Sequence, residues 1–198
     1  MPKPSVLFIV NHAADYHESF YGLLAESTEL TVLARNCESD NLIPPVKRGS
    51  YVYKEGGVLG NDIFFFQRKI IKEVLTDQYD FIVCVLNLRN LTILLGFFFW
   101  KVVKNKSSKW FWWGIIFGEK DNFIENMIRK SLLKRGDGVL VHSDTVKRSL
   151  SEKFFIQSKS YNNSNVRLSD FESPIQSWTP NRLKLLFVGT NKVRKNLG

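Results

Sequence analysis

Cysteine is scarce in this sequence, and its scarcity excludes two kinds of site. The 198 residues contain two cysteines, Cys37 and Cys84, which lie far apart in the chain. Two such residues cannot build a disulfide framework, and they lack the close Cys/His spacing of a zinc site. Cys84 lies inside an apolar run, so we expect it in the core of a protein from a reducing compartment.

Long apolar runs are missing as well. The most apolar segment, residues 91–100, is too short to cross a bilayer, which takes about 20 residues. Four lysines follow it closely: Lys101, Lys104, Lys106 and Lys109. We expect a buried helix here, and the alternative is a helix lying on a membrane surface, because phenylalanines and Trp100 stand beside the lysines.

The N-terminus carries no targeting signal that we recognise. Met-Pro-Lys-Pro-Ser leads directly into an apolar run without a small-residue cleavage site. The sequence therefore predicts a cytoplasmic protein without a signal peptide.

Acidic residues are outnumbered by basic ones. Lys and Arg total 28 against 19 Asp and Glu, which gives a formal net charge of +9. This excess suits a nucleic acid, an anionic membrane surface or a phosphorylated ligand, and it also suits a merely soluble surface. The cations are spread over many segments and form no recognised nucleic-acid-reading motif, so nucleic acid is the disfavoured partner.

Short apolar segments alternate with longer segments of helical spacing. Strands are expected at 5–10, 30–33, 51–53, 81–86, 110–117 and 138–142. Helices are expected at 18–26, 61–75 with Asn61 as N-cap, 91–103, 121–135 ending at Gly136, and 144–154. This alternation predicts an α/β fold: a Rossmann-like parallel sheet with helices on both faces.

The composition changes after residue 156. Residues 157–182 are rich in Ser and Asn and contain Pro174 and Pro180, which is typical of a linker. A new apolar strand follows at 183–188. We therefore expect an N-terminal domain at 1–156, a linker at 157–182, and at 183–198 the first strand and phosphate loop of a truncated second domain.

Parallel sheets bind ligands outside the carboxyl ends of their strands, so the loops there should carry function. These loops are 11–17, 87–90, 117–121 and 142–144. The candidate cleft residues in them are His12, His17, Asn87, Arg89, Asn90, His142 and Ser143. A neutral histidine at such a place can hydrogen-bond a sugar hydroxyl or accept a proton. Each of these residues also has a purely structural alternative. His12 and His17 would belong to a capping loop, His142 would be packed in the protein, and Arg89 would lie at an exposed helix start. His12 and His17 have no third ligand at a spacing that suits a metal.

The last segment joins a buried strand to a basic loop. Gly189 permits a tight turn, and the cations Lys192, Arg194 and Lys195 can neutralise phosphate charge. A solvated loop is the alternative.

Several short motifs resemble those of retaining glycosyltransferases of family 4, in the same order and spread over nearly the whole chain. Residues 187–196, Phe-Val-Gly-x-x-x-x-Arg-Lys-Asn, are similar to the opening of the second domain in that family. The other similar stretches are 21–26 (Tyr-Gly-Leu-Leu-Ala-Glu), 113–118 (Trp-Gly-Ile-Ile-Phe-Gly), 135–143 (Arg-Gly-Asp-Gly-Val through Ser) and 161–163 (Tyr-Asn-Asn).

The resemblance implies two Rossmann-like domains facing across a cleft, the arrangement called GT-B. It implies transfer of a sugar, with retention, from a nucleotide sugar to a glycan or lipid-linked acceptor in the synthesis of a polysaccharide, lipopolysaccharide or capsule. It adds Trp113 and Gly114 to the acceptor-side cleft. It assigns the donor diphosphate to Gly189, Thr190, Lys192, Arg194 and Lys195. No metal or other cofactor is expected, because cations and helix N-termini would meet the phosphate charge.

The chain departs from the family pattern at two places: Thr190 stands where the family has an arginine, and Ile115 stands where it has a histidine. In the family the acidic pair that contacts the donor sugar lies further along the second domain, and residues 1–198 do not include it. Residues 1–198 are therefore not expected to transfer sugar by themselves, and no catalytic residue is assigned. The alternative is a non-catalytic module, or a degenerate fragment, that binds an acceptor or the inner membrane face.

Overall fold

The computed structural model describes residues 2–13, 17–35, 50–60, 64–76, 78–102, 108–114 and 122–160. The chain divides into two compact units, Met1–Arg167 and Leu168–Gly198. All described residues belong to the first unit, and the structural statements below concern them alone.

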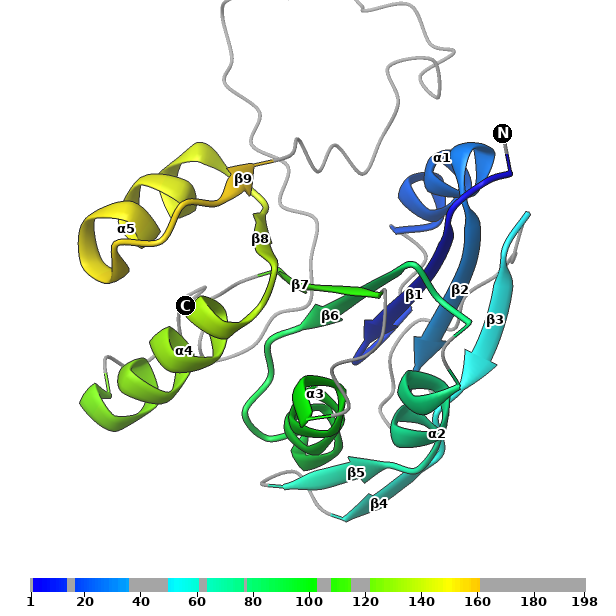
Figure 1. Cartoon of the computed structure of the whole chain (residues 1–198), viewed down its shortest axis with the longest axis horizontal. Helices are drawn as coiled ribbons and strands as arrows, with labels where there is room; N and C mark the ends of the chain where they lie inside the picture. The colour runs from blue at the N-terminus through cyan, green and yellow to red at the C-terminus, as the bar shows by residue number, and fades with distance from the viewer. Residues whose placement is uncertain are drawn as a thin grey trace, which may run out of the picture. The chain divides into compact units, whose positions relative to one another are not determined.

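A parallel sheet of seven strands forms the centre of this unit (Figure 1). Its strands are β1 (Ser5–Val10), β2 (Glu29–Ala34), β3 (Val52–Glu55), β6 (Phe81–Val85), β7 (Lys109–Trp113), β8 (Gly138–Val141) and β9 (Lys159–Ser160). Their order is β3-β2-β1-β6-β7-β8-β9, so the chain first runs outward from β1 and then returns to its other side. The reversal between β1 and β6 is a topological switch point, where such sheets open a crevice at the carboxyl ends of the strands.

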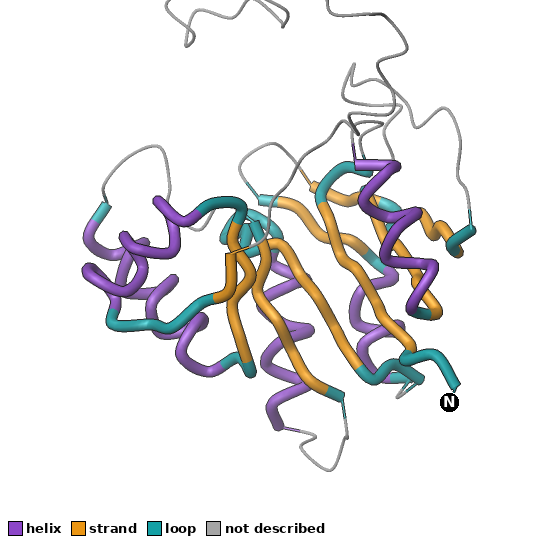
Figure 2. Tube along the Cα trace, turned by 90° about the horizontal axis from the view of Figure 1, so that it is seen from above, coloured by secondary structure: helices purple, strands orange, loops and turns teal. Residues whose placement is uncertain are grey.

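Helices cover both faces of the sheet, as predicted (Figure 2). They are α1 (Glu18–Ser27), α2 (Lys69–Leu75), α3 (Leu91–Val102), α4 (Phe123–Arg135) and α5 (Asp144–Phe154). Buried side chains of α1 pack on one face, and buried side chains of the other four pack on the opposite face. The predicted α/β fold is confirmed.

Strand β1 shows why its sequence is a continuous apolar run. Val6, Phe8 and Val10 belong to the core on the α1 face. Leu7 and Ile9 belong to the core on the opposite face. Because both faces are covered, neither set of alternating positions can be polar.

Local signals set the ends of two helices. The Asn122 side chain accepts a hydrogen bond from the backbone N–H of Ile124 at 3.0 Å, which starts α4, and Gly136 follows its last residue as expected. The Ser143 hydroxyl accepts from the N–H of Val146 at 3.4 Å and starts α5, whose bounds match the prediction. Cys84 is fully buried, as predicted, and burial raises the pKa of its thiol.

The helix predicted at 61–75 is wrong over its first half. Residues Val58–Gly60 (β4) and Phe65–Gln67 (β5) form an antiparallel hairpin, and the helix spans Lys69–Leu75. Along β5 the side chains alternate buried, exposed, buried, which is the period of a strand. The Gln67 N–H donates to the Thr92 hydroxyl at 2.8 Å, a partner that helical spacing could not reveal. Asn61, the predicted N-cap, lies outside the described residues.

Two predicted boundaries also move. Strand β7 ends at Trp113 rather than at residue 117, because Gly114 takes a φ of 105° that turns the chain. The pair Lys159–Ser160 adds β9 to the sheet beside β8, so the sheet continues past the predicted domain boundary at residue 156.

Candidate functional site

Three rings from distant parts of the sequence meet at the carboxyl edge of the sheet. Trp113 ends β7, His142 follows β8, and His17 is the N-cap residue of α1. The ring centroid of Trp113 lies 5.2 Å from that of His142 and 5.7 Å from that of His17. We call these three residues the histidine–tryptophan cluster.

Strand pairing explains why the cluster forms. Trp113 is in register with Leu140 across the β7–β8 pair, and the Gly114 N–H donates to the Leu140 carbonyl at 3.1 Å. A Cβ atom at Gly114 would lie 3.7 Å from Nε2 of His142. That is an ordinary van der Waals distance, so glycine is needed here for its left-handed backbone, with a φ of 105°, and not for space.

Both histidines of the cluster are held neutral. Burial, and next the charge of His142, lower the pKa of His17 to about 4. Burial also lowers the pKa of His142. A neutral imidazole offers one donor and one acceptor nitrogen, which suits hydroxyl groups rather than anions or cations.

Aromatic neighbours fix the tryptophan from behind. Phe8 meets Trp113 edge-on with centroids 4.9 Å apart, and Phe20 stacks on it at 6.4 Å. Trp113 is buried, so its ring forms a fixed aromatic wall beside His142. His142 is only half-buried, so part of its surface remains accessible to solvent.

A second group of predicted residues lies where β1 and β6 end, on the two sides of the switch point. His12 follows β1 and is half-buried. Asn87 follows β6, and its side-chain oxygen accepts from the N–H of Arg89 at 3.0 Å. Arg89 is exposed, as the alternative of an exposed helix start predicted. Its carbonyl accepts a hydrogen bond from the N–H of Phe65 in the hairpin at 3.0 Å. Asn87 and Arg89 thus belong to the loop between β6 and α3, and the Arg89 carbonyl binds this loop to the hairpin.

The structure therefore sorts the predicted cleft residues. It brings His17, Trp113, Gly114 and His142 together, and it uses the Ser143 hydroxyl as a helix cap. The donor-loop residues Gly189, Thr190, Lys192, Arg194 and Lys195, and the loop 117–121, lie outside the described residues. Within the described ranges, no group of three potential ligands could hold a metal ion.

The prediction that Asn90 lines the cleft is wrong, because Asn90 forms a buried amide pair with Gln67, a residue that the sequence analysis did not single out. Gln67 and Asn90 are both completely buried, and the Asn90 amide donates to the side-chain oxygen of Gln67. A Cβ atom at Gly56 would lie 3.0 Å from Nε2 of Gln67, so this glycine makes room for the pair. A lone Gln in an aromatic segment was the available signal.

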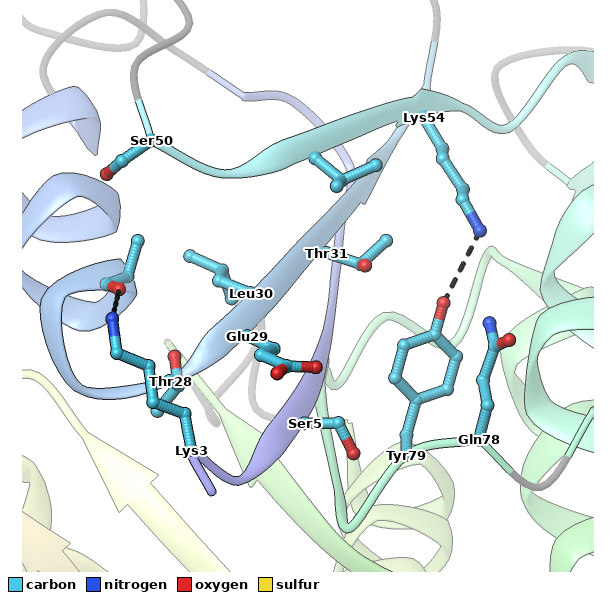
Figure 3. A pocket seen from close by; sticks show the side chains of 12 residues that line it. Lys3, Ser5, Thr28, Glu29, Leu30, Thr31, Ser50, Lys54, Gln78 and Tyr79 are labelled. Atoms are coloured by element: carbon cyan, nitrogen blue, oxygen red, sulfur yellow. Dashed lines mark hydrogen bonds between the residues drawn. The ribbon is translucent and has the colours of Figure 1, made fainter. Parts of the chain in front are cut away.

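A polar depression of about 730 Å³ opens at the other edge of the sheet, at the amino ends of β1, β2 and β3 (Figure 3). Lys54 and Tyr79 line it, and both bind Glu73 behind them: each donates to the same carboxylate oxygen at 2.8 Å. Burial alone would raise the pKa of Glu73, but the bonds from Lys54 and Tyr79 lower it overall. Burial alone would lower the pKa of Lys54, but Glu73 and Tyr79 raise it overall. We call these three residues the lysine–glutamate cluster.

Comparison of the sequence with models of protein families and with curated proteins found no match. The likeness to retaining glycosyltransferases therefore rests on short motifs. One of those motifs supplies Trp113 and Gly114, which the fold places beside two histidines at the carboxyl ends of the strands. None of the helices in the described part of the chain is both long enough and apolar enough to cross a membrane.

Proposed function

We propose that this chain carries the acceptor-side domain of a retaining glycosyltransferase, which moves a sugar from a nucleotide sugar to a glycan or lipid-linked acceptor. The observation that supports this most directly is the histidine–tryptophan cluster. It presents a half-buried neutral imidazole, His142, at the carboxyl edge of a Rossmann-like sheet. An acceptor hydroxyl is the group that such an imidazole recognises.

In the proposed reaction His142 orients the acceptor hydroxyl, and the aromatic wall behind it keeps water away. The hydroxyl oxygen forms a bond to the anomeric carbon of the donor sugar. The bond from that carbon to the diphosphate oxygen breaks, and the nucleoside diphosphate leaves with the hydroxyl proton. By resemblance, Lys192, Arg194 and Lys195 would stabilise the growing diphosphate charge.

Acceptor binding can be tested on the chain as it is. Simple glycosides and glycosyl phosphates are titrated into the protein while the ring protons of its three histidines are followed by NMR. We expect a saturable shift for His142 with at least one glycoside class, and the His142→Ala variant should bind that glycoside more weakly. If no glycoside moves the His142 signals while unrelated ligands do, the acceptor assignment fails.

The donor half of the proposal is tested through two lysines. In a form of the protein that transfers sugar, Lys195→Ala should lower turnover by about 30-fold to nearly 1000-fold, as expected for one lost charge-assisted contact of roughly 2 to 4 kcal/mol. Lys192→Ala is the matched control. It should cost less if Lys192 is a solvated loop residue, and about as much if it replaces the family arginine absent at Thr190. Near-normal turnover and donor affinity for Lys195→Ala would remove that residue from the site.

A second candidate function is binding without catalysis. Two departures from the family pattern, Thr190 and Ile115, favour it. Release of nucleoside diphosphate from a panel of sugar nucleotides, measured with the native gene product in the presence of acceptor, separates an enzyme from a binding module.

A further inference from the structure

Helix α3 is apolar on all of its sides. Thr92 and Lys101 are the polar members of its twelve residues. Thr92 is buried and accepts the hydrogen bond from the N–H of Gln67. The Lys101 ammonium turns toward the domain and donates to the Arg135 carbonyl at 3.1 Å. A helix that is apolar all round is ordinarily covered all round, so the exposed side of α3 calls for a partner.

The exposed side of α3 carries a regular stripe of large apolar residues. Leu95, Phe98 and Val102 are 42%, 60% and 64% exposed, and the half-buried Leu91 lies one turn before Leu95. These residues follow one another at intervals of four, three and four. This is the spacing at which two helices pack along each other. We call these four residues the α3 seam.

The α3 seam is complementary to a second copy of itself. When a second α3 lies antiparallel against it, Leu95 of each copy meets Phe98 of the other, and Leu91 meets Val102. The same contacts then occur twice about a two-fold axis, as in most homodimers. Antiparallel packing also places the N-terminal end of each helix dipole beside the C-terminal end of the other, which is favourable.

The β4–β5 hairpin extends the apolar area beside the seam. Leu59, Phe64 and Phe66 are 47%, 53% and 40% exposed. A backbone bridge at Phe65 joins the hairpin to the residue before α3, and Figure 1 shows β4 and β5 beside this helix. With the seam and Phe99, these side chains expose on the order of 600 Å² per copy, if a whole Phe side chain has about 200 Å². That area lies at the small end of stable interfaces, which bury about 800 Å² per copy.

Charged residues of both signs border this apolar area. The exposed cations are Arg68, Lys69, Lys72 and Arg89. The acidic residues are Glu55, exposed at the end of β3, and Asp62, which lies between β4 and β5 in the sequence. Two copies of a border with one sign of charge would repel each other, whereas a mixed border allows self-association.

Helix α4 exposes large apolar residues too, but it is not complementary to itself. Met127 and Ile128 are among these residues, and all of them lie in the first half of the helix. Seven residues further along the same stripe are the exposed cations Lys134 and Arg135. Two copies packed antiparallel along α4 would therefore set the apolar half of each helix against the cations of the other.

We propose that two copies of this chain associate through the α3 seam, with the two helices antiparallel and the hairpins extending the contact. The association leaves the histidine–tryptophan cluster accessible. Buried side chains of α3 pack on one face of the sheet, whereas Trp113 and the buried side chains of α1 belong to the core on the other face. Self-association is therefore independent of the proposed function.

The test is sedimentation equilibrium of the purified chain from about 1 to 100 µM, the range that suits an interface of this size. We expect a dimer. Leu95→Glu and Phe98→Lys should each weaken it by about 100-fold, because a charge would be buried against the apolar seam. An equimolar mixture of the two variants should form a heterodimer, because the new carboxylate of one chain then lies opposite the new ammonium of the other.

The matched control is Met127→Glu on α4, which places the same charge at another exposed apolar position and should leave the dimer intact. A heterodimer in the mixture also shows that both variant chains fold. The glycoside titration of His142 should be the same for Leu95→Glu and the unaltered chain, so it tests the acceptor site separately.

Four results overturn the proposal. The first is an unaltered chain that stays monomeric at every concentration, whether or not it binds lipid vesicles or another protein. The second is a dimer that survives both Leu95→Glu and Phe98→Lys. The third is a dimer that Met127→Glu abolishes. The fourth is a mixture of the two folded α3 variants that stays monomeric, which excludes the antiparallel arrangement.

Discussion

The two polar clusters of this domain lie at opposite ends of the strands of one sheet. They also differ in how their buried ionisable groups are stabilised. In the lysine–glutamate cluster, the buried carboxylate of Glu73 is matched by the ammonium of Lys54 and the hydroxyl of Tyr79. In the histidine–tryptophan cluster, the buried imidazole of His17 has another histidine as its electrostatic neighbour and aromatic rings around it.

The contrast separates structure from function. Paired opposite charges stay ionised: the pKa of the carboxyl group is lowered and the pKa of the ammonium group is raised. Both shifts stabilise the fold. Two histidines that burial holds neutral have moved toward the protonation state that a hydroxyl ligand requires, at an edge where parallel sheets bind ligands. We expect substitutions in the first cluster to act on stability and substitutions in the second to act on binding.

The largest expected effect is on the lysine–glutamate cluster. Glu73→Ala leaves Lys54 and the Tyr79 hydroxyl without their acceptor and should lower the free energy of unfolding by about 3 kcal/mol. Urea unfolding followed by circular dichroism measures it. Glu152→Ala, on the exposed side of α5, is the control and should cost less than about 0.5 kcal/mol. A loss for Glu73→Ala no larger than this control would contradict the structural role.

The next effect is a dependence of stability on pH. The pKa of His17 is about 4 in the folded chain and about 6.5 when unfolded, so the unfolded state binds more protons between these values. Stability from this group is complete above pH 6.5 and should decline by about 3 kcal/mol as the pH falls toward 4. His17→Gln should flatten the decline, as measured by urea midpoints across that range. Identical pH profiles for the two proteins would exclude His17 as its source.

A glycine comparison sharpens the role of the turn after β7. Gly114→Ala places a side chain at a φ of 105° and should lower stability by about 1 to 2 kcal/mol, although its methyl group would make only an ordinary contact with His142. Gly22→Ala, in helix α1, meets no atom within 4 Å and should stabilise by about 0.5 to 1 kcal/mol. Thermal melting of both variants checks the opposite signs.

The smallest effect on stability belongs to the residue with the clearest predicted role. His142 is half-buried, so His142→Ala should change the free energy of unfolding by less than about 1 kcal/mol. Glycoside affinity, measured by the same NMR titration, should fall about tenfold, the value of one hydrogen bond to a hydroxyl. An unchanged affinity would contradict the assignment of a binding role to the histidine–tryptophan cluster.

Residue patterns predicted the sheet and failed at the hairpin, for a reason that particular contacts show. The apolar run of β1 and the capped amphipathic α5 carry their own signals, because burial on two faces or on one stripe leaves a period in the sequence. The hairpin depends on Asn90 and Thr92, which lie more than twenty residues further along the chain. The apolar residues between 63 and 74 fit a helical period equally well, so local spacing could not decide.

The sequence predicted at which end of the strands the candidate site lies. It did not predict which residues belong to the site. Parallel topology places every loop after a strand on one side of the sheet, so the sequence could nominate His12, His17 and His142 together. Which of them share a cluster depends on strand order, since β8 lies next to β7 and α1 covers that part of the sheet. No residue pattern in the sequence indicates this strand order.

Helix α4 is attached to the rest of the domain mainly near its carboxyl end. Leu133 is its single buried residue, and the Trp112 indole donates to the Leu132 carbonyl at 3.0 Å, so both anchors lie near its carboxyl end. The first turn is capped by Asn122, and its Phe123 and Ile124 side chains are exposed. In amide hydrogen exchange, α4 should therefore open from its amino end by local unfolding well before the sheet exchanges, with protection rising steadily toward Leu133.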